Sequence, residues 1–440
     1  MINLKKLVTL SLALTLITTT LLTPTLANSA DISSSNIPVE KNLKTAKLLG
    51  KSEVLTIVKS HIENYMKNDI QTKGKSITPG TDLINLYDLN DNLFAYVVPL
   101  LENGKEEIGY ITVGALEDGY NVYEIFIDPD ALQNLKSELI TAENSPAKKI
   151  IFVPPFSYIL KDKVNDEDKF YDLSQHNRGK DITDQVKENK TKIEKVHNTI
   201  RSTKNKDQIQ KILLNTTKST VANTTTQSVS SITGTTEDVR LINEASFIPI
   251  TNGTQTYYGG DQNWYSTSSK QNNGCGPTAA ANITSYLDRK SSASYGNLYS
   301  PSGITKSEFL THMDALYTAL DPSFIGEFTL TGFRNDVKTF ASGRGVTLTD
   351  SYNDCSGTID GVANFIKYGL IDDTPVACLN RELPGWYDYA WHWMSITKYF
   401  KDVNDNRWIA VSTWGERRSI DFSYYYNSTL ASGGGFVYFN

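Results

Sequence analysis

The stretch that decides the fold runs Asn272-Asn-Gly-Cys-Gly-Pro-Thr-Ala-Ala-Ala-Asn-Ile283. Pro277 suits the first turn of a helix, because the N–H that proline lacks has no partner there in any residue. The pattern therefore places Cys275 at a helix start, where exposed N–H groups and the positive end of the helix dipole stabilise a thiolate. Two flanking glycines leave the sulfur open to a substrate backbone. Because the thiolate is the attacking form of cysteine, we predict that Cys275 is a nucleophile and not a structural core residue.

A nucleophilic cysteine needs a general base, and the C-terminal region offers two histidines, His312 and His392. His312 lies within an amphipathic helical segment, which favours a surface or half-buried position. His392 begins an apolar segment that is typical of a strand. A turn and a return strand then bring Ser412 and the two residues after it back beside this histidine. We therefore predict that His392 is the base.

The order of these elements resembles the papain-like cysteine peptidases. Cys-Gly-Pro-Thr-Ala-Ala-Ala-Asn-Ile is followed by a late histidine before an apolar strand, and then by Ser412-Thr-Trp-Gly415. The chain is most similar to the bacteriocin-peptidase-like secreted proteins of Gram-positive bacteria, also in the segment from Phe365 to Leu379. The resemblance covers residues 246–440. It implies an α+β catalytic domain in which a helical part carries the nucleophile and an antiparallel sheet carries the base.

By position, the resemblance makes Cys275 the nucleophile and His392 the base. The family commonly orients its histidine with an Asn or Asp, often two residues before the Trp-Gly pair, and here Ser412 occupies that position. A serine hydroxyl accepts the imidazole N–H but does not stabilise an imidazolium as a carboxylate would. The oxyanion hole would combine the Cys275 backbone N–H with an upstream Gln side chain. Gln262 and Gln271 are the candidates, and Gln262 is preferred.

The chain of 440 residues is long enough for more than one domain. A basic start, an apolar run and small residues predict a signal peptide at residues 1–30, so we expect a secreted protein, free or at the cell surface. Residues 31–160 predict a small α+β domain, whose strands look like the pro-domains of such peptidases. Residues 161–245 predict a charged helix and a Thr/Ser-rich linker, before the papain-like domain at 246–440. In that last domain we expect helices at 276–287, 306–320, 334–342 and 358–368, and strands at 374–380, 393–400, 408–413 and 435–439.

Composition and spacing exclude several classes of protein. The net charge of −6 argues against a nucleic-acid partner, and no segment after the signal is apolar and long enough to span a membrane. Metal-ligand spacings and Gly-rich phosphate loops are missing from the sequence, so we expect no metal and no cofactor. Three cysteines are too few for a disulfide scaffold. Cys378 has the setting of a core residue, and spacing leaves a pairing between Cys355 and Cys378 open.

The sequence thus predicts a secreted cysteine peptidase, a monomer that hydrolyses bonds in a peptide or protein substrate. We expect it to be made as a zymogen, in which the N-terminal domain covers the cleft as a propeptide until the linker is cut. The alternative is a weakly active or inactive papain-fold module that binds a peptide or glycan at the cell surface. Ser412 motivates this alternative, since it stands where a stronger orienting group is expected. A more distant alternative is another acyl transfer by the same dyad, such as transglutaminase-like or amidase chemistry on cell-wall peptides.

Overall fold

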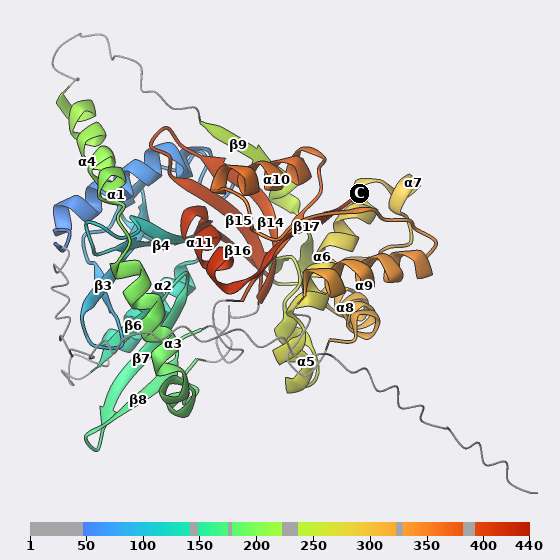
Figure 1. Ribbon diagram of the computed structural model, residues 1–440, viewed down its shortest axis with the longest axis horizontal. Coiled ribbons are helices and arrows are strands. Elements are labelled where there is room, and N and C mark those ends of the chain that lie inside the picture. The colour runs from blue at the N-terminus through green and yellow to red at the C-terminus, as the bar shows by residue number, and fades with distance from the viewer. Residues whose placement is uncertain (1–46, 141–147, 175–177, 222–235, 323–328, 382–391) are drawn as a thin grey trace, which may run out of the picture. The chain divides into compact units, whose positions relative to one another are not determined.

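The computed structural model describes residues 47–140, 148–174, 178–221, 236–322, 329–381 and 392–440. All of them belong to one compact unit, Ala46–Asn440. The expected signal peptide at residues 1–30 lies outside the described residues. Helices and a large mixed sheet make this an α+β protein, as the sequence predicted (Figure 1). In the part of the chain that the structure describes, no helix is both long and apolar enough to cross a membrane.

Residues 47–221, here called the N-terminal part, combine long strands with α-helices. The helices are α1 (Lys51–Asn64), α2 (Pro129–Ile140), α3 (Thr183–Arg201) and α4 (Lys206–Val221). The strands are β1 (Ile77–Pro79), β2 (Ile84–Tyr87), β3 (Leu93–Glu102), β4 (Glu106–Gly114), β5 (Val122–Phe126), β6 (Lys149–Val153), β7 (Ser157–Val164) and β8 (Glu167–Asp172).

Residues 236–440, the C-terminal part, begin with mostly helical structure and end in a sheet. The helices are α5 (Ser268–Asn273), α6 (Cys275–Lys290), α7 (Ser292–Tyr295), α8 (Lys306–Leu320), α9 (Leu330–Gly343), α10 (Ile359–Ile371) and α11 (Phe422–Ser432), with a short 3-10 helix η4 (Gln262–Trp264). The strands are β9 (Glu237–Arg240), β10 (Pro249–Thr251), β11 (Thr256–Tyr258), β12 (Asp350–Asn353), β13 (Val376–Asn380), β14 (His392–Lys401), β15 (Arg407–Thr413), β16 (Glu416–Asp421) and β17 (Gly435–Phe439). Figure 1 shows α6, α8 and α9 grouped beside this sheet.

One sheet runs through both parts in the order β12-β17-β13-β14-β15-β16-β5-β4-β3-β2-β6-β7-β8, with β1 on β3 and β9 on β14. The junction between the parts is the antiparallel pair β5–β16, which aligns Ile125 with Ser419 and Glu124 with Ile420. Both apolar clusters of the core contain residues from each part. One of the two clusters contains Val54, Ile57 and Val58, which are helically spaced in α1, together with Trp408 of β15.

The expected domain boundaries fall within this continuous structure. Residue 160 lies inside β7 (Ser157–Val164). The expected charged helix is α3, and it buries Val186 and Ile193 against the core although its exposed side is highly charged. Part of the expected linker forms β9, which pairs with β14 and aligns Arg240 with Lys398. The described residues from 47 onward therefore belong to one folded unit.

Candidate active site

Cys275 is the first residue of α6, where the sequence placed it. The preceding residue must be small, because a Cβ on Gly274 would lie 2.4 Å from the Tyr265 ring and 2.5 Å from the Lys270 carbonyl oxygen. The ring of Tyr265 and the end of α5 thus hold the start of α6 closely. Cys275 is 7% exposed, and the helix behind it, including Ala280, is buried. The thiol therefore belongs to the first residue of a helix whose start is held in place by its neighbours.

His392 is the first residue of β14 and lies opposite Asn380 of β13. Its Nε2 atom is 2.8 Å from the Thr413 hydroxyl oxygen, and its ring stacks on the indole of Trp414 with centroids 4.3 Å apart and planes 8° apart. His392 is 4% exposed. The contact with Thr413 and the stacking on Trp414 therefore help to fix the position and the plane of the imidazole.

The turn between β15 and β16 delivers these two contacts. Trp414 and Gly415 have φ angles of 46° and 73° and connect the paired residues Thr413 and Glu416, which is the geometry of a two-residue type I′ hairpin. A left-handed conformation costs a residue with a Cβ about 1–2 kcal/mol. At Trp414 the stacking on His392 accompanies this unusual backbone, and such conformations cluster at functional sites.

Ser412 does not contact His392, contrary to its predicted role. Its hydroxyl donates a 2.6 Å hydrogen bond to the carbonyl of Tyr258 and accepts a 3.4 Å one from the Asn282 amide. Consecutive side chains of a strand point to opposite faces of the sheet, so Ser412 and Thr413 face different environments. Close packing surrounds Ser412, since a Cβ on Gly259 would lie 2.3 Å from its oxygen. The hydroxyl beside His392 is that of Thr413, a residue that the sequence did not indicate.

Gln262 and Gln271 tie η4 to α5, just before Cys275. The Gln262 amide donates to the Gln271 carbonyl at 2.7 Å. The Gln271 amide donates to the carbonyls of Asn263 at 3.1 Å and Tyr265 at 2.8 Å. A carboxamide has two N–H donors, so Gln271 uses both of its donors on backbone carbonyls while Gln262 uses one. This geometry favours Gln262 as the oxyanion donor.

His312 lies away from the start of α6. It is 1% exposed, and its Nε2 is 2.9 Å from the hydroxyl oxygen of Thr284. Thr284 follows Cys275 by nine residues, which is about 13 Å along a helix axis. Burial lowers the pKa of His312 to about 3, helped by the charge of Arg344. His312 is therefore a buried residue of the core, where the sequence predicted a surface or half-buried one.

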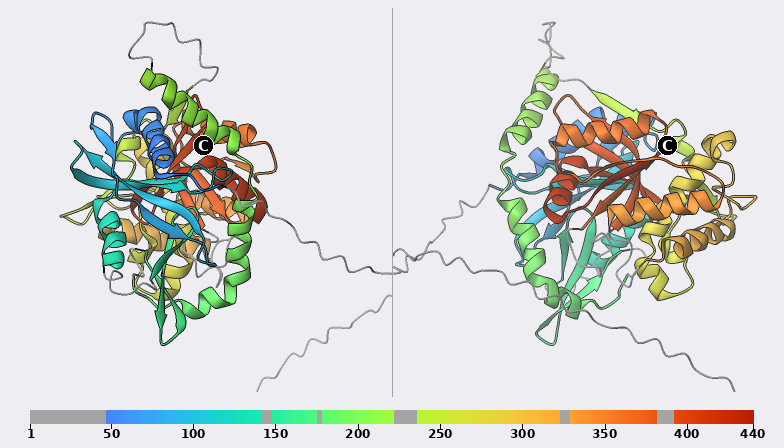
Figure 2. Two further views of the ribbon diagram at one scale, coloured as in Figure 1. Left: turned by 90° about the vertical axis from the view of Figure 1, so that its left-hand side faces the viewer. Right: turned by 45° about the vertical axis from the view of Figure 1, so that its right-hand side comes forward.

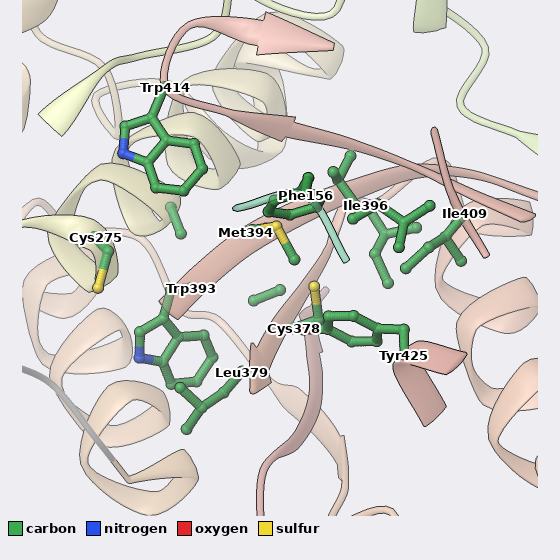
Figure 3. Close-up of a cluster of buried hydrophobic side chains, with 14 of the residues drawn as sticks. Phe156, Cys275, Cys378, Leu379, Trp393, Met394, Ile396, Ile409, Trp414 and Tyr425 are labelled. Atoms are coloured by element: carbon green, nitrogen blue, oxygen red, sulfur yellow. The ribbon is translucent and has the colours of Figure 1, made fainter. Parts of the chain in front are cut away.

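Figure 3 shows Cys275 among the buried side chains of the C-terminal part. Cys275, Trp393 and Trp414 belong to one buried cluster, in which α6 packs against β14. Trp393 follows His392 directly, and Trp414 stacks on it. Helix α6 and strand β14, which begin with Cys275 and His392, are therefore packed against each other although they are far apart in the sequence.

Burial also sets the electrostatics of this site. Loss of solvent lowers the pKa of His392 to about 3, so its imidazole is neutral near pH 7. Burial raises the thiol pKa of Cys355 and of Cys378 to about 12, with Asp354 adding to the effect at Cys355. These two described residues are not joined by a disulfide, and Cys378 lies inside β13 as a core residue. Neither is suited to nucleophilic chemistry.

Among the residues that the structure describes, no group of three His, Cys, Asp or Glu side chains is arranged to hold a metal ion. Comparison with protein-family models, with curated proteins and with solved structures found no match for this chain. The interpretation of the site therefore depends on its residues and their geometry.

Proposed function

We propose that the protein is a cysteine peptidase with a papain-like catalytic domain, which hydrolyses peptide bonds with Cys275 and His392. The observation that carries this proposal is the pair of elements α6 and β14, which pack against each other. A cysteine begins a helix, and a histidine held by Thr413 and Trp414 begins the neighbouring strand. Helices followed by the antiparallel strands β13–β17 support the papain-like arrangement.

Each group has a defined part in the reaction. When Nε2–H of His392 donates to Thr413, Nδ1 carries the lone pair and takes the thiol proton of Cys275. The thiolate then attacks the substrate carbonyl, and the Cys275 backbone N–H with the second N–H of Gln262 stabilises the oxyanion. His392 returns the proton to the leaving amine, and water then hydrolyses the thioester by the same route.

We further propose that the protein is exported and made in a latent form. The signal-like sequence of residues 1–30 supports export. Cys275 and His392 are both buried, so a substrate reaches the sulfur only after the site opens locally. The neutral state of the buried imidazole supports latency as well, because the thiolate lacks a cationic partner before opening.

The test is Cys275→Ala, which should abolish hydrolysis of peptide substrates and keep the melting temperature and circular dichroism of the wild type. Cys355→Ala is the matched control. Cys355 is also buried, it is far from Cys275 in the sequence, and its thiol pKa is high. The control should keep the activity. If Cys275→Ala cleaves peptides as fast as the wild type, the proposal is wrong.

The second candidate function is a papain-fold module that binds a peptide or glycan with little or no catalysis. Burial lowers the pKa of His392, and its hydroxyl partner stabilises an imidazolium less than a carboxylate would, so both features favour this candidate. Iodoacetamide distinguishes the two. An activated Cys275 reacts at about pH 6, well below the ordinary thiol pKa of about 8.5, whereas slow labelling at that pH supports the binding module.

A further inference from the structure

The C-terminal part buries a large aromatic surface against the N-terminal part. Trp408 of β15 stacks on Tyr65 with ring centroids 5.2 Å apart and meets the edge of His61 at 5.3 Å. Phe400 of β14 packs edge-on against Tyr65 at 5.1 Å. Trp408 and Phe400 are almost fully buried. Removal of residues 47–221 would expose these rings to water, at a cost of about 25 cal/mol per Å² of apolar surface.

A second contact between the N-terminal and C-terminal parts lies at Tyr424 of α11. Its ring meets the edges of Tyr120 at 5.3 Å and Tyr123 at 5.6 Å, and its hydroxyl donates to the Pro154 carbonyl at 3.2 Å. In Figure 3, Phe156 of the N-terminal part lies beside the C-terminal side chains Met394 and Ile396. The N-terminal part therefore reaches the cluster that also contains Cys275.

Buried ion pairs cross the same interface. Asp69 accepts hydrogen bonds from Arg417 at 2.7 Å and from Lys398 at 3.2 Å, and all three side chains are almost inaccessible to solvent. Burial alone would raise the pKa of Asp69, but the two cations hold it well below its usual range. Glu124 pairs with Arg418 at 2.6 Å. Asp69 thus shares Arg417 with Glu244 and Lys398 with Asp238, so carboxylates of both parts pair with the two buried cations.

The backbone is continuous across the interface as well. Strand β5 pairs with β16, and the Tyr65 hydroxyl lies 2.7 Å from that of Ser419. In Figure 2 the blue and green strands of the N-terminal part lie against the red strands of the C-terminal part. Without β5, strand β16 would have an unpaired edge, which favours aggregation. β16 also adjoins the turn that carries Trp414 beside His392.

We propose that the N-terminal part, residues 47–221, is a permanent partner of the C-terminal part and stays bound after the chain is cut between residues 221 and 236. Its surface fits residues 236–440 of the same chain as the interface of an obligate complex does, with an apolar core and paired charges. It supports β16 and the turn that fixes His392, so it does not act as a cover that leaves. The inference does not depend on peptidase activity.

The experiment places a recognition site for a specific added protease within residues 222–235 of the full chain. After complete cutting, gel filtration at about 1 µM should give one species that contains both fragments, because an obligate interface holds together at this concentration. Its melting temperature should stay within a few degrees of that of the uncut protein. Separation into two species, with the C-terminal fragment folded and soluble, overturns the proposal.

Asp69→Asn in the cuttable chain tests whether the buried ion pairs hold the fragments together. The dissociation constant of the cut variant should rise at least about tenfold, since a buried charge pair loses one partner. Asp82→Asn, at an exposed position of the N-terminal part, is the matched control and should leave the constant unchanged. Equal dissociation constants for cut Asp69→Asn and cut Asp82→Asn would contradict the role of Asp69. Circular dichroism of each uncut variant checks folding, and the cut wild type answers the main question even if Asp69→Asn misfolds.

Discussion

The substitution Thr413→Val removes the hydroxyl that contacts His392 and keeps nearly the same volume. The hydroxyl oxygen lies 2.8 Å from Nε2, and both residues are buried. A buried polar group that loses its partner costs about 1–3 kcal/mol. Because about 1.4 kcal/mol corresponds to a factor of ten in rate, kcat/KM should fall by about 5- to 150-fold. The loss should appear mainly in kcat, since Thr413 positions the base and has no assigned contact with the substrate.

The assay is hydrolysis of a fluorogenic peptide over a range of pH, together with nitrogen NMR shifts of His392. An acceptor for the imidazole N–H favours the charged form, so its loss should move the acid limb of kcat/KM to lower pH. The NMR shifts report whether Nε2 carries the proton. They therefore test the positioning of His392 even if turnover is slow. Thr413→Ser keeps the hydroxyl and should restore both readouts.

Ser412→Ala is the control that decides between the two hydroxyls. It removes the hydrogen bond to the Tyr258 carbonyl, so it should lower stability by about 1 kcal/mol and leave the acid limb in place. The reasoning is refuted if Ser412→Ala shifts the pH profile while Thr413→Val behaves like the wild type. That result would mean that the histidine is oriented by the residue two positions before Trp414, as the family resemblance implied.

Two further predictions concern stability, measured by urea unfolding. Gly274→Ala should lower the free energy of unfolding by about 1–3 kcal/mol, because its Cβ would overlap the Tyr265 ring. The control Gly343→Ala has open space at its Cβ and should be neutral or stabilising. Equal effects of the two substitutions would contradict the close packing before α6. For His312, the folded pKa of about 3 lies below the unfolded value of about 6.5, so its stabilising contribution is present above pH 6.5 and is lost as the pH falls. The destabilisation by His312→Asn should therefore be about 2 kcal/mol smaller at pH 5 than at pH 7, and an unchanged difference would show that His312 titrates normally.

The helix that begins with Cys275 and the strand that begins with His392 were predictable, because a few neighbouring residues are enough to indicate each of them. Pro277 and the glycines on either side of Cys275 predict a helix start, and α6 begins at Cys275. The expected helix at 306–320 coincides with α8. The apolar segment after His392, the polar turn and the return strand correspond to β14 and β15. Periodicity and turn chemistry operate over a few residues, so a single sequence is enough to detect them.

The error at Ser412 has a geometric cause. In a strand, a shift of one residue moves a side chain to the opposite face, and a count of positions back from Trp414 does not show which face meets His392. The turn supplies that information, because Trp414 and Gly415 are its two central residues and Thr413 is the last residue of β15. A Trp-Gly pair between two strands is the signal that could have identified Thr413 in advance.

The packing of the N-terminal part against the C-terminal part was not predictable from such local patterns. Asp69 and Arg417 are separated by most of the chain, and nothing in the sequence around either residue indicates its partner. The segment at 161–245 has the composition of a solvated helix and a linker, but α3 buries a narrow apolar stripe that includes Val186 and Ile193. Composition averages over both faces of a helix and hides such a stripe.

The burial that holds the two parts together also bears on activation. Under the proposed function, an imidazolium–thiolate pair forms only when water or substrate dipoles reach His392, because burial alone lowers its pKa. The contacts with Thr413 and Trp414 already fix the ring, so activation must change the solvation of His392 and not its orientation. Opening near Cys275 achieves that while the interface at Tyr65 and Asp69 stays closed. Loss of the N-terminal part would instead remove β5 from β16 and loosen the turn on which the orientation of His392 depends.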